Sequence, residues 1–148
     1  MSVQRSIRKV ALLFDDIVRP DTTGGYCLRA LRGLVHVQHF RPSEMQRIPK
    51  GFDLYLNIDD GLEYKLPSHL GPWALWAIDT HLQPERITHR ATGATFVFTA
   101  QRDGLEWRRR QCGSGGALLP LAADLDIHRR FDLQPLYDTC FVGHINCE

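Results

Sequence analysis

Short apolar segments, each followed by polar or acidic residues, recur along the chain. Most are apolar at almost every position, which is typical of strands buried on both faces of a sheet. Segment 35–40 differs, because apolar and polar residues alternate in it, and this favours a strand nearer the sheet edge. The predicted strands are residues 9–14, 35–40, 52–58, 73–78, 95–99 and 117–121.

Three segments between these strands have the pattern of helices. Residues 26–34 carry an apolar stripe of Leu28, Leu31 and Leu34. Residues 84–92 begin with a proline and are followed by Gly93, and residues 102–111 form the third predicted helix. Strands that alternate with helices predict an α/β fold, a Rossmann-like parallel sheet with helices on both faces.

Right-handed crossovers favour a strand order such as 3-2-1-4-5 for this sheet. In that order the switch point falls between the first and fourth strands. The loops after Phe14 and after Ile78 would then border one crevice. This topology brings segment 22–25 close to segment 79–81.

Composition narrows the possible partners and compartments. The 148 residues are enough for one domain with its own core, and 43% apolar and 24% charged residues are unremarkable. A net charge of +1 gives no support for a nucleic-acid partner. No apolar run approaches the roughly 20 residues of a membrane span, and the first residues lack a signal-peptide pattern. The sequence therefore predicts a cytoplasmic protein without a membrane span.

The cysteines and histidines do not have the spacing of a metal site. Cys27, Cys112, Cys140 and Cys147 form no CxxC pair, and the histidines show neither HxxxH nor HExxH spacing. We therefore predict no metal and reduced thiols.

Asp79 and His81 follow a buried strand, and ligands of open α/β sheets bind beyond such strand ends. An imidazole there can act as an acid or base, or hydrogen-bond a substrate hydroxyl. The competing interpretation is a histidine with a purely structural hydrogen bond.

Two further features have both a functional and a structural interpretation. Gly24 and Gly25 precede a predicted helix, where backbone amides can approach a phosphate, although a tight turn before a capped helix explains them equally. Asp59 and Asp60 end the third strand, where carboxylates serve as cation ligands or general bases. Turn formation and capping are their structural alternative.

Five short motifs in order together resemble the CgeB-like, spore-maturation type of glycosyltransferase, which is related to the GT-B group. The resemblance covers residues 9–143. The motifs are RPDTTGGYCLRAL, WAIDTHL, FVFTAQRDG, LPLAADLDIHRRF and YDTCFVG.

The resemblance implies sugar transfer from a nucleotide-sugar donor to an acceptor, in a cleft between two Rossmann-like domains. The N-terminal domain would bind the acceptor. Gly24 and Gly25 correspond to a glycine loop near the donor diphosphate, and His81 to a histidine that contacts the transferred sugar. Asp79, Gln101 and Arg102 would line the same cleft, and no cofactor beyond the donor is implied.

The resemblance also divides the chain. Residues 1–135 would be the acceptor-side domain, and residues 136–148 the first strand of a truncated donor-binding domain. We therefore expect this chain alone to be inactive. The surface that would pack against the second domain would be an apolar strip that favours self-association, formed by Leu119, Leu121, Tyr137 and Phe141.

Two other classes of function remain open. One is a non-catalytic binding or regulatory remnant of the transferase fold. The other is a receiver-like signalling domain, in which Asp15 and Asp16 form the acidic pair and Asp59 accepts a phosphoryl group. Thr99 would supply its hydroxyl, but the extra strand at 73–78 and the lack of a lysine after the final strand argue against this class.

Overall fold

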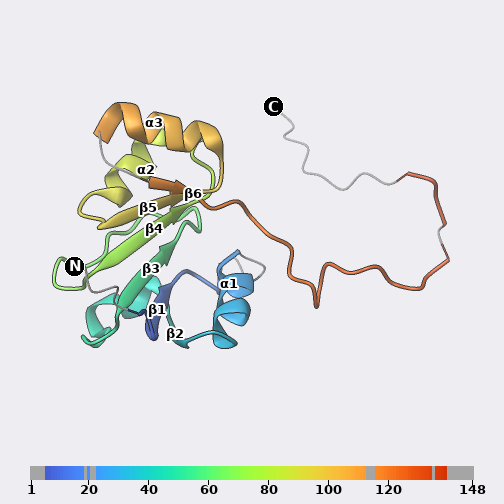
Figure 1. Ribbon diagram of the computed structural model, residues 1–148, viewed down its shortest axis with the longest axis horizontal. Coiled ribbons are helices and arrows are strands. Elements are labelled where there is room, and N and C mark those ends of the chain that lie inside the picture. The colour runs from blue at the N-terminus through green and yellow to red at the C-terminus, as the bar shows by residue number, and fades with distance from the viewer. Residues whose placement is uncertain (1–5, 19, 21–22, 113–115, 135, 140–148) are drawn as a thin grey trace.

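The computed structural model describes residues 6–18, 20, 23–112, 116–134 and 136–139 (Figure 1). The described residues form one six-stranded sheet in which every neighbouring pair is parallel. The strands are β1 (Lys9–Leu13), β2 (His36–Phe40), β3 (Leu54–Ile58), β4 (Trp73–Ala77), β5 (Phe96–Thr99) and β6 (Gly116–Leu118). The α/β, Rossmann-like class expected from the sequence is confirmed.

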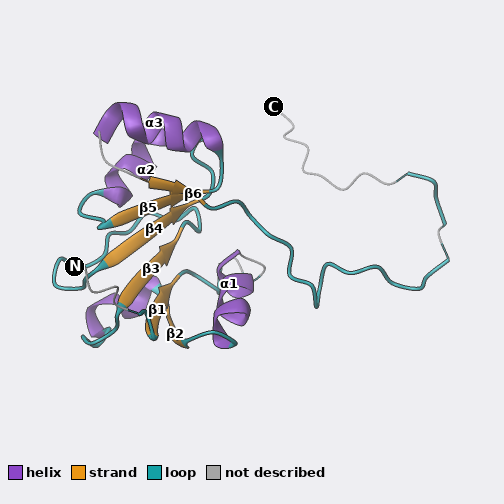
Figure 2. Ribbon diagram, in the orientation of Figure 1, coloured by secondary structure: helices purple, strands orange, loops and turns teal. Residues whose placement is uncertain are grey.

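Helices pack on both faces of this sheet (Figure 2). Helix α1 (Thr23–Arg32) packs Cys27, Leu28 and Leu31 against one face. Helix α2 (Pro84–Ala91) buries Ile87 and Ala91 against the other. The 3-10 helix η1 (Pro42–Arg47) adds Met45 to the α2 side, and α3 (Arg102–Cys112) follows β5.

The strand order is β2-β1-β3-β4-β5-β6, so the expected order 3-2-1-4-5 is wrong. Strand β3 lies between β1 and β4, and β2 forms the edge. Burial explains the arrangement, because β3 is buried at four of its five positions whereas β2 is buried only at Phe40. The switch point therefore lies between β1 and β3, as in flavodoxin-like sheets.

Helix α1 begins three residues earlier than the sequence suggested, at Thr23. Gly24 and Gly25 are consequently in its first turn and do not form a loop before it. The end of the predicted apolar stripe is also wrong, because Leu34 lies beyond the helix and is 79% exposed. Gly93 follows α2 as expected and has a φ of 86°, and Gly61, after β3, has a φ of 83°.

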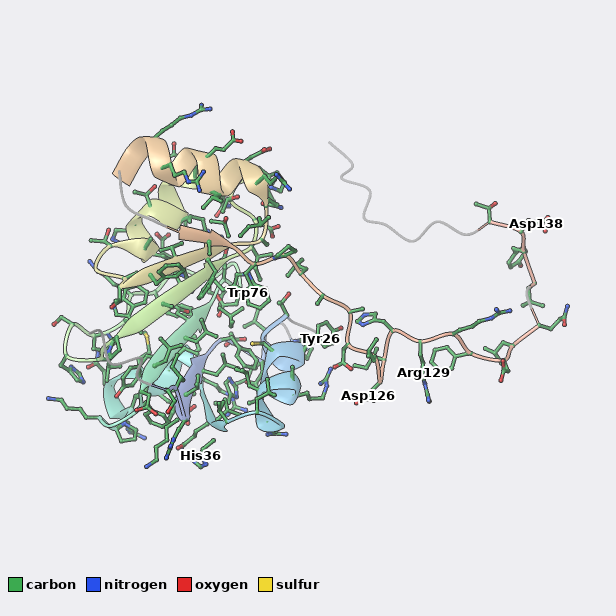
Figure 3. All side chains as sticks on the ribbon, in the orientation of Figure 1. Tyr26, His36, Trp76, Asp126, Arg129 and Asp138 are labelled. Carbon is green, nitrogen blue, oxygen red and sulfur yellow. The ribbon has the colours of Figure 1, made fainter. Side chains whose placement is uncertain are left out.

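The chain after β6 leaves the sheet as an extended segment (Figure 1). Its first part, residues 119–128, runs past α1, where Asp124 forms an ion pair of 2.6 Å with Arg29. Figure 3 shows Tyr26 and Asp126 at this junction, and Arg129 and Asp138 farther out. Residues 136–139 form no strand, whereas the rest of the strand expected at 136–142 lies outside the described residues.

No helix in the described part of the chain is long and apolar enough to cross a membrane.

Candidate functional site

A pocket of about 570 Å³ opens at the carboxyl ends of β1, β3 and β4. This volume falls within the range of small-ligand sites, roughly 300–1,000 Å³. The pocket lies at the switch point, where ligands of open α/β sheets bind. Its lining residues are Val18, Pro20, Thr23, Asp59, Asp60, Gly61, Ile78, Asp79, Leu82, Gln83 and Arg86.

The expected crevice is present, although the strand order behind it differs. Thr23, at the start of α1, and Asp79, after β4, line the same pocket. The end of β3 lies between them, since β3 separates β1 from β4. Asp59 and Asp60 therefore form the centre of the pocket floor.

A buried arginine, Arg90 on α2, holds the two floor carboxylates. Its Nη1 donates to Asp59 Oδ1 at 3.1 Å, to Asp60 Oδ1 at 3.2 Å and to the Leu62 carbonyl at 3.0 Å. Its Nη2 donates to Asn57 Oδ1 at 2.9 Å. The Arg90 side chain is 0% exposed, so its charge requires these partners. The cluster therefore fixes the end of β3 against α2.

Arg86, one helical turn before Arg90, binds the same Asp59 carboxylate from the pocket side. Its Nη1 and Nη2 lie 2.8 and 3.3 Å from the two Asp59 oxygens, and its Nε donates to Gln83 Oε1 at 2.6 Å. Burial alone would raise the pKa of Asp59, but the Arg86 hydrogen bond and the charges of Arg90 and Arg86 outweigh it. The pKa of Asp59 is therefore lowered below its ordinary value.

Asp60 and Tyr64 complete the cluster. Asp60 Oδ2 accepts hydrogen bonds from the Tyr64 hydroxyl at 2.8 Å and from the Asp15 backbone amide at 2.9 Å. The Arg90 guanidinium lies 4.3 Å from the centre of the Tyr64 ring, a cation–π contact. Burial raises the pKa of Tyr64, so this hydroxyl stays protonated. The cluster thus ties the end of β1 to the end of β3.

Asp79 and His81, the predicted catalytic pair, occupy different positions. The Asp79 side chain is exposed, lines the pocket, and makes no hydrogen bond or ion pair with another described residue. His81 is exposed at the neighbouring rim, with Nδ1 3.3 Å from Gln101 Oε1, and is not among the lining residues. Asp79 is therefore the carboxylate that a ligand can reach directly.

Gln101 and Arg102 lie beside His81 at the end of β5. Gln101 Oε1 accepts a hydrogen bond from the Thr80 hydroxyl at 3.0 Å, and Arg102 is an exposed residue at the start of α3. Neither is among the described residues that line the pocket. They extend a polar rim from the pocket toward β5.

The two predicted phosphate-binding glycines have different environments. Gly24 is buried against the Phe14 ring, which occupies the space a Cβ atom would need. Gly25 has open space in that direction. Close helix–strand packing therefore explains Gly24, which leaves only Gly25 without a structural reason for being glycine.

The acidic residues after β1 do not converge with Asp59. Asp15 Oδ1 accepts hydrogen bonds from the amides of Ile17 and Val18, at 3.0 and 2.6 Å. Asp16 is held by Arg41, whose Nε lies 2.6 Å from Oδ1, and this hydrogen bond lowers the pKa of Asp16. Among the described residues no group of three acidic, histidine or cysteine side chains could hold a metal ion.

Arg86, Arg90 and Tyr64 were not among the site residues predicted from the sequence. The signal for the arginines was present, because they are four residues apart and flank Ile87 and Ala91 on the buried face of α2. A charged side chain on an apolar helix face needs a partner, and Asp59 and Asp60 were the available candidates.

Comparison with protein-family models finds no match, and neither do comparisons with curated proteins and with solved structures.

Proposed function

We propose that this domain is the acceptor-side half of a sugar-transferring enzyme and that the pocket at the ends of β1, β3 and β4 binds the acceptor. The observation that carries the proposal is a pocket of ligand size at the switch point, with a carboxylate, Asp79, that has no side-chain partner among the described residues. The motif resemblance to CgeB-like glycosyltransferases supplies the class of reaction.

The floor and the rim of the pocket have separate roles in this proposal. The ion-paired floor, formed by Asp59, Asp60 and two arginines, is rigid and keeps the strand ends in place. Asp79 accepts a hydrogen bond from an acceptor hydroxyl and orients it. His81, at the rim beside Gln101, acts on the sugar that a donor-binding domain presents from across the cleft.

Donor binding is the first test. Uridine and guanosine diphosphate sugars are titrated into the purified chain by calorimetry, and nucleotide release is followed with a mixed pool of acceptors. We expect weak binding and no turnover, because catalysis requires both halves of the cleft to position the reacting atoms. If the chain alone shows turnover, and His81→Ala abolishes it, the proposal that transfer requires a second, donor-binding domain would be contradicted.

A receiver-like signalling role is the second candidate, and the strand order is the observation that favours it, because receivers share the flavodoxin-like arrangement. The site argues against it. The Asp59 side chain is only 2% exposed and both of its oxygens are held by arginine. Thr99 is also buried, and its hydroxyl has no hydrogen-bond partner in the part of the chain that the structure describes.

We therefore expect no phosphorylation of Asp59 by acetyl phosphate and magnesium. Mass spectrometry of the treated protein after borohydride trapping measures it. A phosphorylated Asp59 would replace the transferase proposal with the receiver one.

A further inference from the structure

The charge of the pocket bears on the kind of acceptor it can hold. Among the described lining residues, three carboxylates, those of Asp59, Asp60 and Asp79, line it together with a single guanidinium, that of Arg86. Buried Arg90 behind the floor compensates one of these negative charges. The described residues of the pocket therefore carry one net negative charge, located at the side of Asp79, which is unpaired among them.

Arg86 is not available to attract an anion. Its Nη atoms contact both Asp59 oxygens, its Nε is bonded to Gln83, and its side chain is 11% exposed. An incoming phosphate or carboxylate would have to displace Asp59, leaving that buried charge with one fewer partner. Displacement of this kind is costly, on the order of several kcal/mol.

The partial positive charge at the start of α1 does not offset the net negative charge of the pocket. A helix N-terminus contributes a partial charge of about +0.5, which is smaller than the net negative charge of the carboxylates. Its contribution to the lining is Thr23, a neutral hydroxyl group. The pocket therefore favours ligands that donate hydrogen bonds or carry positive charge.

We propose that the acceptor is a polyhydroxylated compound that carries a protonated amine, such as an amino sugar, and that Asp79 selects it by pairing with the ammonium group. This inference rests on the proposed acceptor role of the pocket. It further places the diphosphate of the donor outside this pocket.

Three monosaccharides of similar size but different charge test the proposal: glucosamine, glucose and glucuronate. Each is titrated into the full chain, and dissociation constants are taken from amide chemical shifts. We expect glucosamine to bind more tightly than glucose by up to about five-fold, the upper end for a solvent-exposed ion pair, and glucuronate to bind most weakly. The preference should weaken as salt is added.

Asp79→Asn should remove the preference for glucosamine, so that glucosamine and glucose bind with similar affinity. Asp132→Asn is the matched control, because Asp132 is an exposed carboxylate on the extended segment after β6. It should change none of the three affinities.

Equal binding of the three sugars, or tightest binding of glucuronate, would overturn the proposal that the pocket selects its ligand by charge. Neither result would contradict the acceptor-binding role of the pocket. A preference for glucosamine that survives Asp79→Asn would overturn the assignment to Asp79. Binding of none of the three would overturn the inference, and the acceptor role would then depend on the separate donor and transfer assay.

Discussion

At the residue scale, Arg90 is the side chain on which the site depends most. It is fully buried, and it compensates the charges of both floor carboxylates at the end of β3. Its removal would leave Asp59 with Arg86 as its cationic partner, and Asp60 with none among the described residues. Such an imbalance is more damaging than the loss of an exposed ion pair.

Arg90→Met is therefore expected to lower the free energy of unfolding by about 3–5 kcal/mol. Urea denaturation followed by circular dichroism measures it. Arg110→Met is the control, because Arg110 is exposed and its ion pair with Glu106 spans 3.7 Å. An equally small effect of both variants would show that the buried cluster does not stabilise the fold.

The lowered pKa of Asp59 predicts a pH dependence. A carboxyl whose pKa is lower in the folded state contributes stability above its ordinary pKa and loses that contribution as the pH falls. The stability difference between the parent chain and Asp59→Asn should therefore shrink as the pH is lowered from about 6 to about 3. Urea midpoints at several pH values measure it, and a constant difference would contradict the ion-paired state of Asp59.

Gly24 and Gly25 form a matched pair of adjacent residues in α1. Gly24→Ala should destabilise the domain by about 1–3 kcal/mol, because the new methyl group meets the Phe14 ring. Gly25→Ala should leave stability unchanged or raise it by up to about 1 kcal/mol, as alanine favours helix. Thermal unfolding separates the two, and equal effects would refute the packing explanation for Gly24.

At the same scale, the sequence identified the strand-end carboxylates but not their partners. Asp59 and Asp60 were placed correctly at the end of the third strand, because the apolar pattern stops there. Their ion pairs with α2 depend on which helix face meets which strand end. The spacing of Arg86 and Arg90 signals that they need acidic partners, but the geometry of the contacts comes from packing.

At the element scale, the strand order departs most clearly from expectation. The alternation in β2 correctly indicated a strand near the sheet edge. The pattern of segment 52–58, which includes Asp53 and Asn57, did not indicate that β3 lies between β1 and β4. Crossover handedness alone does not distinguish the two orders, since both are compatible with right-handed connections.

Strand β4 is the most buried element, and all five of its positions are buried. Trp73 packs into the core on the α2 side, whereas Trp76 lies on the α1 side and donates from Nε1 to the Leu119 carbonyl at 2.9 Å. Trp73→Ala should cost about 3–5 kcal/mol. Tyr137→Ala, which changes an exposed aromatic residue, should cost almost nothing in the same urea titration.

At the scale of the whole molecule, apolar residues are concentrated on the segment after β6. Leu119, Leu121 and Tyr137 of the expected strip are exposed, and Phe141 lies outside the described residues. The sequence predicted this strip from the motif resemblance. A surface of this kind favours association with another chain or domain.

Concentration-dependent self-association is therefore expected of the purified chain. Sedimentation velocity at increasing concentration should show a rising weight-average coefficient. The double substitution Leu121→Ser and Tyr137→Ser should reduce this concentration-dependent rise in the sedimentation coefficient. A monomer throughout the concentration series would contradict the association role of this strip.

The pocket at the ends of β1, β3 and β4 is proposed as the ligand site, and mapping of amide chemical shifts during a glucosamine titration tests this assignment. Saturable shifts are expected to be concentrated at Gly61, Asp79 and Leu82, which line this pocket. Saturable shifts confined to the groove between α1 and residues 119–126, around Tyr26 and Leu125, would show that the ligand binds elsewhere.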